Sequence, residues 1–442
     1  MLALCFCLFF AMVAAALATG HSVAWALLGG LAVFWLLGRR QGYTPGQLWN
    51  MAWTKCKKSL IVVKVILLIG VITGLWRCSG TIAFCIVEGV GLVTPRLFLV
   101  TAFLLSGALS YVLGTSYGVC STMGVILMAL ARSGGVDPAA AAGVIVSGAY
   151  FGDRCSPASS AASLVAAVTG TDLYANVRQM LRTGLLPTVL TLGVYLFLSP
   201  RHPLSALDGE VLTALTEGFT ISWTALIPAA VMFLLPLFKV PIKWAMAASI
   251  TAAAAVALAV QGFSPLELLS AAWGGYHPED PALAAVLEGG GITSMAVSYV
   301  IVTLTGLYSG ILEGTGDLEP LDRKAEALAA KIGRFPAMTA VSTLCAAILC
   351  NQAVASILSE QLLGRCYSSR EELAMDIENS GIMTAGLIPW SIACSIPLSM
   401  LGADSRAVPY AVLLWMTPLC YFFTKRWFYP GAVSGKSDES TV

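Results

Sequence analysis

The sequence predicts an all-α polytopic membrane protein whose helices are interrupted in several places. Of its 442 residues, 57% are hydrophobic and 11% are charged, whereas roughly 25% of an average soluble domain is charged. A helix that crosses the hydrocarbon core needs about 20 apolar residues, and the uncharged stretches therefore indicate roughly ten to thirteen spans. The stretches without Asp, Glu, Lys or Arg are 1–38, 97–131, 155–171, 183–200, 219–238, 244–266, 289–312, 335–359, 379–403 and 407–424.

The composition also excludes several classes of protein. Charge is too scarce to cover a soluble surface, which excludes a cytosolic globular enzyme. A formal net charge of +1 leaves no basic face for nucleic acid, so the lipid bilayer is the expected surrounding. The twelve cysteines fall mostly inside apolar runs without the spacing of metal ligands, and we interpret them as packing residues. No cofactor is expected, and a homodimer is one of the oligomeric states considered.

Basic residues predict the orientation in the membrane. The stretch 39–58 contains five Lys or Arg residues and no acid, and positively charged loops face the cytoplasm. Two spans precede this stretch, so the N-terminus is expected in the cytoplasm as well. Lys425 and Arg426 follow the last apolar run and predict the same side for the C-terminal end.

The chain is expected to divide into three parts. Residues 1–199 form a first transmembrane half, and residues 200–288 form a connector with two simple spans over 219–238 and 244–266. Residues 289–442 form a second transmembrane half that ends in a short cytoplasmic tail. Within that half, the mixed charges of 317–334 predict a solvated amphipathic connector.

Each half contains apolar segments that small and polar residues interrupt. The interruptions are expected at 114–118 and 152–157 in the first half, and at 351–352 and 378–381 in the second. Non-helical backbone at membrane depth is tolerated only where protein or a water-filled cavity satisfies its polar groups. Close helix packing through small residues is the alternative explanation. Breaks at matching places in two halves favour the binding site of an inverted-repeat secondary transporter.

Asp153 is the most informative residue. Between residues 138 and 171 only Asp153 and Arg154 are charged, and a carboxylate at membrane depth costs several kcal/mol unless it is paired, hydrated or protonated. Burial favours its protonated form, so proton and cation can compete for it. The alternative is an interfacial pair. Ser156 is expected to cap the following helix, with Pro157 at its first position.

Other carboxylates are weaker candidates. Glu88 is the only charge between residues 80 and 95, and Glu313 directly follows the uncharged run 289–312. Either could be a second proton site or an interfacial anchor. Asp376 and Glu378 precede the last expected break and could face water at the mouth of a cavity.

An enzyme is an alternative to a transporter, because residues 114–118 match G-x-S-x-G. In hydrolases this motif follows a strand, and the serine needs a nearby base. Here the motif lies inside an uncharged run, and His21, His202 and His277 all lie outside the spans. We therefore expect no catalytic residue. The triple glycine 289–291 lacks the lysine of a phosphate loop, which leaves an ion gradient as the energy source.

At these positions the chain resembles the NhaC-type sodium/proton antiporters, a family within a larger ion-transporter superfamily. The resemblance covers nearly the whole chain and is carried by residues 114–116, 148–157, 173–180, 289–290, 310–313, 378–381 and 387–390. It implies exchange of Na⁺ for H⁺ across the bacterial inner membrane and an inverted-repeat fold with re-entrant segments. Related members exchange organic acids, such as malate for lactate.

The chain departs from the family pattern at its polar positions. Where the family has Ser-Asp-Thr-Thr-Asn, residues 159–163 read Ser-Ser-Ala-Ala-Ser, and Asn379 stands where the family has Asp. Two carboxylates are thereby lost. Arg77 and Glu88 occupy positions that the family fills with uncharged residues, and Glu88 could restore one of the lost acids.

The sequence thus predicts a secondary antiporter that exchanges Na⁺ or Li⁺ for H⁺ by alternating access. The runner-up is an ion-coupled exchanger of small organic acids or amino acids. Asp153 is the predicted proton and cation exchanging group and the ligand of the transported Na⁺, with Glu88 and Glu313 as further candidates. The predicted oxygen ligands are Thr115, Ser116, Ser156, Ser159 and Ser160 from the first half, and Asn351, Glu378, Asn379 and Ser380 from the second.

Overall fold

The computed structural model describes residues 2–19, 21–92, 94–205, 209–238, 240–316 and 322–429. Within these ranges every regular element is a helix, and the β contact is one isolated bridge between Tyr276 and Gly289. The predicted all-α class is therefore confirmed. Parts of the two expected connectors (206–208 and 317–321) and the expected C-terminal tail (430–442) lie outside the described residues.

The helices fall into three groups along the chain. The first group is α1 (Leu2–Thr19), α2 (Val23–Arg40), α3 (Pro45–Cys78), α4 (Thr81–Leu92), α5 (Phe98–Leu113), α6 (Ser116–Ser121), α7 (Met123–Ser133), α8 (Pro138–Cys155), α9 (Ser160–Thr169) and α10 (Leu173–Leu198). The second is α11 (Gly209–Gly218), α12 (Ile227–Leu237), α13 (Ile242–Ala259), α14 (Pro265–Gly274) and α15 (Pro281–Leu287). The third is α16 (Ala296–Gly314), α17 (Asp322–Ile332), α18 (Arg334–Leu349), α19 (Gln352–Leu363), α20 (Arg370–Asn379), α21 (Gly381–Ala385), α22 (Ile392–Met400) and α23 (Val412–Phe428).

Interruptions shorten many of the apolar helices. Four helical segments in the described residues are long and apolar enough to cross a membrane by themselves, and up to six if each bent pair counts as one span. This is fewer than the predicted number, because breaks divide several apolar runs into helices of 10–17 residues. The segment Trp223–Pro236 lies within the span expected over 219–238, and α11, which precedes that span, meets it at an angle of 91°.

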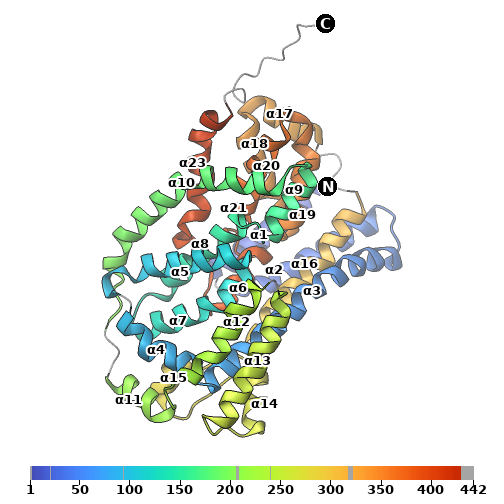
Figure 1. Ribbon diagram of the computed structural model, residues 1–442. Helices are drawn as coiled ribbons and strands as arrows, with labels where there is room; N and C mark the ends of the chain where they lie inside the picture. Colours follow the sequence, from blue (N-terminus) through green and yellow to red (C-terminus); the bar gives the residue numbers. More distant parts are fainter. Residues whose placement is uncertain are drawn as a thin grey trace.

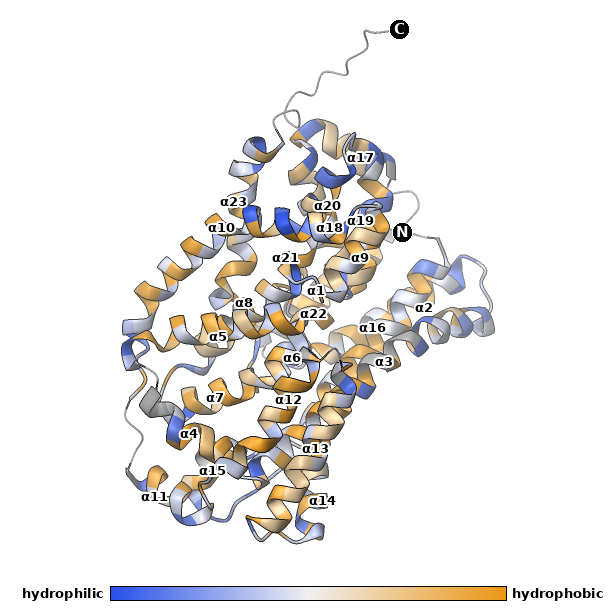
Figure 2. Cartoon of the chain, in the orientation of Figure 1, coloured by the Kyte–Doolittle hydropathy of each residue, from blue (hydrophilic) through white to orange (hydrophobic). Residues whose placement is uncertain are grey.

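The distribution of hydrophobic residues matches that of a protein whose middle lies in the membrane. Hydrophobic residues cover most of the helices in the middle of the molecule, and hydrophilic residues gather at α17, at α20 and at the turn between α2 and α3 (Figure 2). The C-terminal end of α23 lies beside α17 at the top, whereas α11 and α14 lie at the bottom (Figure 1). The chain is a polytopic membrane protein.

Glycines bring α5 and α8 into close contact. These helices pack along each other in the middle of the molecule (Figure 1). A Cβ atom on Gly152 would lie 2.0 Å from the carbonyl carbon of Ser110, and one on Gly148 would lie 2.6 Å from the carbonyl oxygen of Phe103. Small residues four apart allow such an approach. The end of α8 that carries Asp153 is thereby fixed against α5.

The core consists of two hydrophobic clusters that meet at α8. Ala149 and Tyr150 belong to the first cluster, Cys155 belongs to the second, and Phe151 contacts both. Both halves of the sequence contribute to both clusters, so the halves interleave rather than pack as separate bodies. The end of α8 therefore lies on the boundary between two packed units.

Candidate functional site

Two helix breaks from the first half touch each other. α5 ends at Gly114, whose φ of 65° is in the left-handed region, and Thr115 then caps α6 through the backbone N–H of Gly118. A Cβ atom on Gly114 would lie 2.4 Å from the carbonyl carbon of Ala158, which belongs to the break between α8 and α9. Only glycine combines this backbone conformation with so close an approach. Gly114 therefore allows the two predicted breaks of the first half to touch each other.

The second break differs from its prediction in one detail. Ser156 does not cap α9; residues 157–158 form a turn, and Ser159 is the capping residue. The Ser159 hydroxyl oxygen accepts hydrogen bonds from the N–H groups of Ala161 and Ala162, whereas Ser156 accepts one from Ala158. Pro157 lies in this turn, and α9 begins at Ser160, three residues later than expected.

Asp153 lies where these two breaks touch, and its carboxylate is buried. The residue is 7% exposed, and its Oδ2 atom accepts a hydrogen bond of 2.8 Å from Ser116 Oγ. The Ser159 hydroxyl donates to the Asp153 carbonyl oxygen and lies 3.5 Å from Oδ1. No cation pairs with this carboxylate among the described residues. Its immediate partners are therefore hydroxyl groups, which can also ligate a hard cation.

The neighbouring Arg154 points to different partners. It is 2% exposed, and its Nη2 atom donates to Thr183 Oγ1 at 2.9 Å and to Asn379 Oδ1 at 2.6 Å. One guanidinium group thus ties α8 to α10 and to α20 of the second half. Arg154 was predicted only as a partner of Asp153, and Thr183 was not predicted at all. The isolation of Arg154 as a charge in an apolar run was the available signal.

Glu378 adds a second buried carboxylate. It is fully buried, and neither of its carboxylate oxygens has a hydrogen-bond partner among the described residues. Arg154 attracts it, and Asp153 repels it. The expectation that Asp376 and Glu378 face water at a cavity mouth is wrong, because both are 0% exposed. Helix α20 places them in the interior, between α9, α10 and α18.

The second half repeats the backbone pattern of the first break. α18 ends at Cys350 with a φ of 52°, and Asn351 then caps α19 through Ala353 and Val354. Cys350 is the only non-glycine residue with positive φ in the described ranges. The same order of a left-handed residue and a capping residue occurs at Gly114 and Thr115.

The break expected at 378–381 is a single-residue interruption in the structure, and a longer gap that was not predicted follows it. At Ser380 the helix is interrupted by a single residue, and the longer gap covers residues 386–391, between α21 and α22. The backbone N–H of Ile392 donates to the Cys350 carbonyl at 2.9 Å, so the two breaks of this half also adjoin. The Ser380 hydroxyl donates to the Asp376 carbonyl and keeps this stretch of chain close to a helix.

Tyrosines connect the breaks of the two halves. Tyr117 of α6 donates to the carbonyl of Ile392 at 3.3 Å, and Tyr150 of α8 donates to the carbonyl of Ala393 at 2.7 Å. Both bonds reach the first turn of α22. Together with the Arg154–Asn379 bond, they hold the two touching breaks of the first half against the breaks of the second half.

The remaining predicted residues lie in several environments. Ser156 and Ser380 are buried, Thr115 and Asn351 use their side chains as helix caps, and Ser160 is exposed. Glu88 is exposed on α4, and no ion pair involves it among the described residues. Glu313 is exposed at the end of α16 and forms an ion pair of 2.7 Å with Lys55. Glu88 and Glu313 thus lie outside the group around Asp153.

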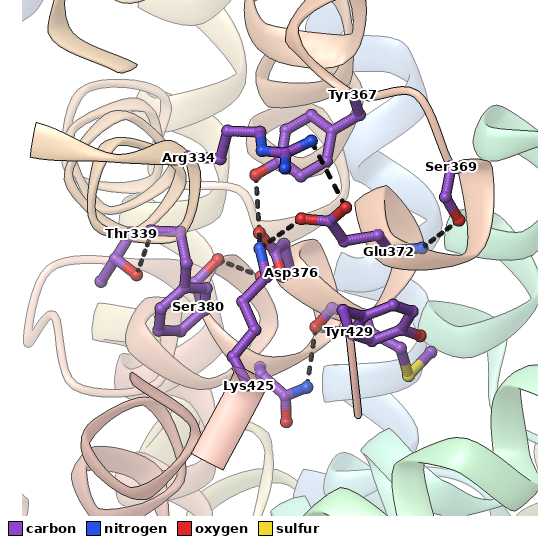
Figure 3. Close-up of polar contacts among 12 residues, drawn as sticks. Arg334, Thr339, Tyr367, Ser369, Glu372, Asp376, Ser380, Lys425 and Tyr429 are labelled. Carbon is purple, nitrogen blue, oxygen red and sulfur yellow. Dashed lines mark hydrogen bonds and ion pairs between the residues drawn. The ribbon is translucent and has the colours of Figure 1, made fainter. Parts of the chain in front are cut away.

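A second cluster of charges was not predicted (Figure 3). Lys425 Nζ lies 2.7 Å from Glu372 Oε1 and 2.5 Å from Asp376 Oδ2, and Tyr367 donates to the same Asp376 oxygen at 2.7 Å. Arg334 contributes a longer contact of 3.5 Å to Glu372. Lys425 is only 7% exposed. We refer to these five residues as the Lys425 cluster; it joins α18, α20 and α23.

Broken helices that adjoin in pairs, with ionisable groups buried beside them, are features of ion-coupled secondary transporters. Comparison with known proteins agrees. The profile of the Na⁺/H⁺ antiporter family matches residues 1–162 and, in a second match, residues 148–424. The chain belongs to this family, so it is an antiporter and not an enzyme, as the sequence predicts.

The relatives of this chain are named for different solutes. The chain is 26% identical to the Na⁺/H⁺ antiporter NhaC of Alkalihalophilus pseudofirmus over 85% of this chain and 83% of that protein. It is 26% identical to the malate-2H⁺/Na⁺-lactate antiporter of Bacillus subtilis, over 92% and 89%. It is also 25% identical to the arginine/ornithine antiporter ArcD of Halobacterium salinarum, over 89% and 84%.

Proposed function

We propose that this antiporter exchanges Na⁺ or Li⁺ for H⁺, and that Asp153 binds the two ions in alternation. The observation that carries the proposal is a buried carboxylate whose nearest partners are hydroxyls rather than a cation. A hard cation prefers oxygen ligands, and Ser116, Ser159 and nearby backbone carbonyls supply them. Because Asp153 has no positively charged partner in the described part of the chain, either a proton or Na⁺ can neutralise it.

The charge of the whole group supports a single exchanged charge. Asp153 and Glu378 contribute two negative charges when ionised, and Arg154 contributes one positive charge. The sum is one negative charge, which one proton or one Na⁺ neutralises. Desolvating a net charge at membrane depth is costly, so this group favours one bound cation at every stage.

Alternating access follows from the boundary position of the site. At the α8–α9 break and at the α21–α22 break, some neighbouring residues belong to the first hydrophobic cluster and others to the second. Movement of one cluster against the other would shift the polar contacts at the breaks while each cluster stays packed. Such rocking around a fixed site is the usual motion of transporters with broken helices.

The orientation and location are proposed on charge. Five Lys or Arg residues in 39–58, without an acid, support a cytoplasmic N-terminus. The location supported by the resemblance is the bacterial inner membrane. We propose that 1–199, 200–288 and 289–442 are three regions of the sequence and not three separately packed units.

A second candidate function is ion-coupled exchange of small organic acids or amino acids. The specific observation that favours it is the range of solutes named among the relatives, which includes malate, lactate, arginine and ornithine.

Everted membrane vesicles with a pH-sensitive dye test the proposal. Addition of Na⁺ or Li⁺ to respiring vesicles should release accumulated protons, and Asp153→Asn should abolish the response. Glu313→Gln is the matched control, because Glu313 is an exposed carboxylate outside the site. Full exchange by Asp153→Asn would refute the assignment of the site. A response to organic acids but not to Na⁺ alone would favour the second candidate.

A further inference from the structure

A cavity that Asp153 does not line contains two arginines that form no ion pair with an acid among the described residues. It has a volume of about 210 Å³ and lies between α3, α7, the C-terminal end of α22 and residues 286–295. Arg77 of α3 and Arg132 of α7 both line it. Neither arginine has an ion pair with Asp or Glu in the described residues.

Both guanidinium groups keep donors available. Arg77 is 9% exposed; its Nη1 atom donates to the Thr73 carbonyl, while its buried Nε atom has no partner among the described residues. Arg132 Nη2 donates to the carbonyls of Leu401 and Gly402, both at 3.0 Å. Two like charges in a poorly solvated place repel each other, and an anion between them would relieve that cost.

One carboxylate also lines the cavity. Glu288 is about half exposed, with a side-chain exposure of 59%, and its Oε1 atom lies 3.2 Å from His277 Nδ1. Its charge is directed to His277 at the rim rather than to either arginine. The charged groups that line the cavity therefore leave a surplus of positive charge.

The rest of the lining indicates an anion with a carbon skeleton. Val125, Met128, Val286, Met295 and Met400 supply apolar surface beside the arginines. Chloride would gain nothing from such surface, whereas the planar fork of an arginine matches a carboxylate. At about 30 Å³ of liquid volume per water molecule, the cavity has room for about seven water-sized groups, which is the size of a small organic acid.

The cavity is linked to the exchange site by two helices. α7 follows α6 directly, and α22 begins where Tyr117 and Tyr150 bind its first turn. Both helices run from there to the cavity, which lies at Arg132 and Leu401. At a rise of 1.5 Å per residue, the nine steps from Met123 to Arg132 span about 14 Å.

We propose that Arg77 and Arg132 form a binding site for a small organic carboxylate, separate from the Asp153 group. The site does not depend on Asp153, so its test is independent of the proposed Na⁺/H⁺ exchange. The acid would bind with its carboxylate against the arginines and its carbon chain against the methionines.

Equilibrium binding to the purified full-length protein in nanodiscs of neutral lipid tests this inference. Radiolabelled lactate and malate are the probes, with no ion gradient present. At least one should bind saturably, and Arg77→Gln and Arg132→Gln should each weaken binding at least tenfold. Arg77→Lys should weaken it less, because it keeps the charge but loses the fork. Arg96→Gln is the control, since Arg96 is exposed and does not line the cavity.

Each remaining outcome decides the inference. Asp153→Asn should bind the acid as the unaltered protein does, even if Na⁺/H⁺ exchange is lost. No saturable binding of any probe would overturn the inference, as would equal binding by folded Arg77→Gln and Arg132→Gln, with folding checked by thermal unfolding. Complete displacement by chloride, or by anionic phosphatidylglycerol in the nanodiscs, would assign the cavity to an inorganic ion or to a lipid headgroup and would also overturn it.

Discussion

Asp153 and Asp376 are both buried aspartates, but their partners differ. Asp153 receives a hydrogen bond from a serine hydroxyl, and no cation contacts its carboxylate in the described residues. Asp376 is bound by Lys425 and by the Tyr367 hydroxyl, and Glu372 shares the same lysine. Burial alone therefore does not mark an exchanging carboxylate. A carboxylate that already has a fixed cation is neutralised within the protein, whereas one surrounded by hydroxyls can take a mobile cation.

The largest expected effect comes from breaking the Lys425 cluster. Lys425→Met leaves Glu372 and Asp376 buried without their cation, which should lower the free energy of unfolding by about 3–5 kcal/mol. Thermal unfolding in detergent should show a clear fall in melting temperature, and the double variant Lys425→Met with Asp376→Asn should recover part of it. Arg426→Met, on the exposed face of the same helix, should change little. Unchanged stability of Lys425→Met would contradict the assignment of this cluster to structure.

The contact of α8 with α5 should be the next most sensitive feature. Gly152→Ala would place a Cβ atom 2.0 Å from the Ser110 backbone, so the helices must separate. We expect a loss of about 1–3 kcal/mol in stability and a loss of exchange, because Asp153 follows directly. Gly193→Ala is the control, since a Cβ atom there would meet nothing within 4 Å. Normal exchange by Gly152→Ala would show that the position of Asp153 does not depend on this contact.

Arg154→Met tests whether the arginine compensates one of the two site carboxylates. Without its positive charge, keeping Asp153 and Glu378 ionised costs more. A higher pH is then needed before the site releases its proton and accepts Na⁺. The pH of half-maximal exchange should therefore rise by about one unit. Arg178→Met, on the exposed face of α10, should leave the profile in place. A profile that does not move would show that Arg154 acts only as a structural tie.

The smallest effect is expected at the hydroxyl ligands. Ser116→Ala removes one hydrogen bond to the Asp153 carboxylate, worth about 1 kcal/mol, or about a fivefold loss of apparent Na⁺ affinity. Concentration dependence of the vesicle response measures it. Ser160→Ala is the control, because Ser160 is exposed one residue after the cap of α9. Equal losses in both variants would argue against Ser116 as a ligand.

Local features were predictable from the sequence. Scarce and clustered charge predicts the all-α membrane class. Glycine and polar residues predict breaks at 114–118, 152–157 and 351–352, and the structure has them at 114–115, 156–159 and 350–351. The polar residues 378–381 predict the interruption at Ser380, but the longer gap at 386–391 was not predicted. A proline disfavours helix in the residue before it, so Pro389 was the available signal for this gap.

Contacts between distant residues could not be predicted. The bond from Arg154 to Asn379 joins residues 225 positions apart, and Lys425 reaches Asp376 across 49 positions. Lys425 was interpreted as a cytoplasmic loop charge, which its position at the end of the last apolar run favours. Packing of α23 against α18 and α20 buries it instead. A residue type gives its chemistry, but only the fold supplies its partner.

Proton release on Na⁺ binding tests the central claim most directly. In the purified protein, weakly buffered and without a membrane gradient, addition of NaCl should release protons that a pH dye detects, and choline chloride should release none. The Asp376→Asn variant should still release protons if it folds. In the unaltered protein the Asp376 carboxylate is paired with Lys425 and is not expected to exchange ions. Asp153→Asn should release none. Undiminished proton release by folded Asp153→Asn would contradict the account.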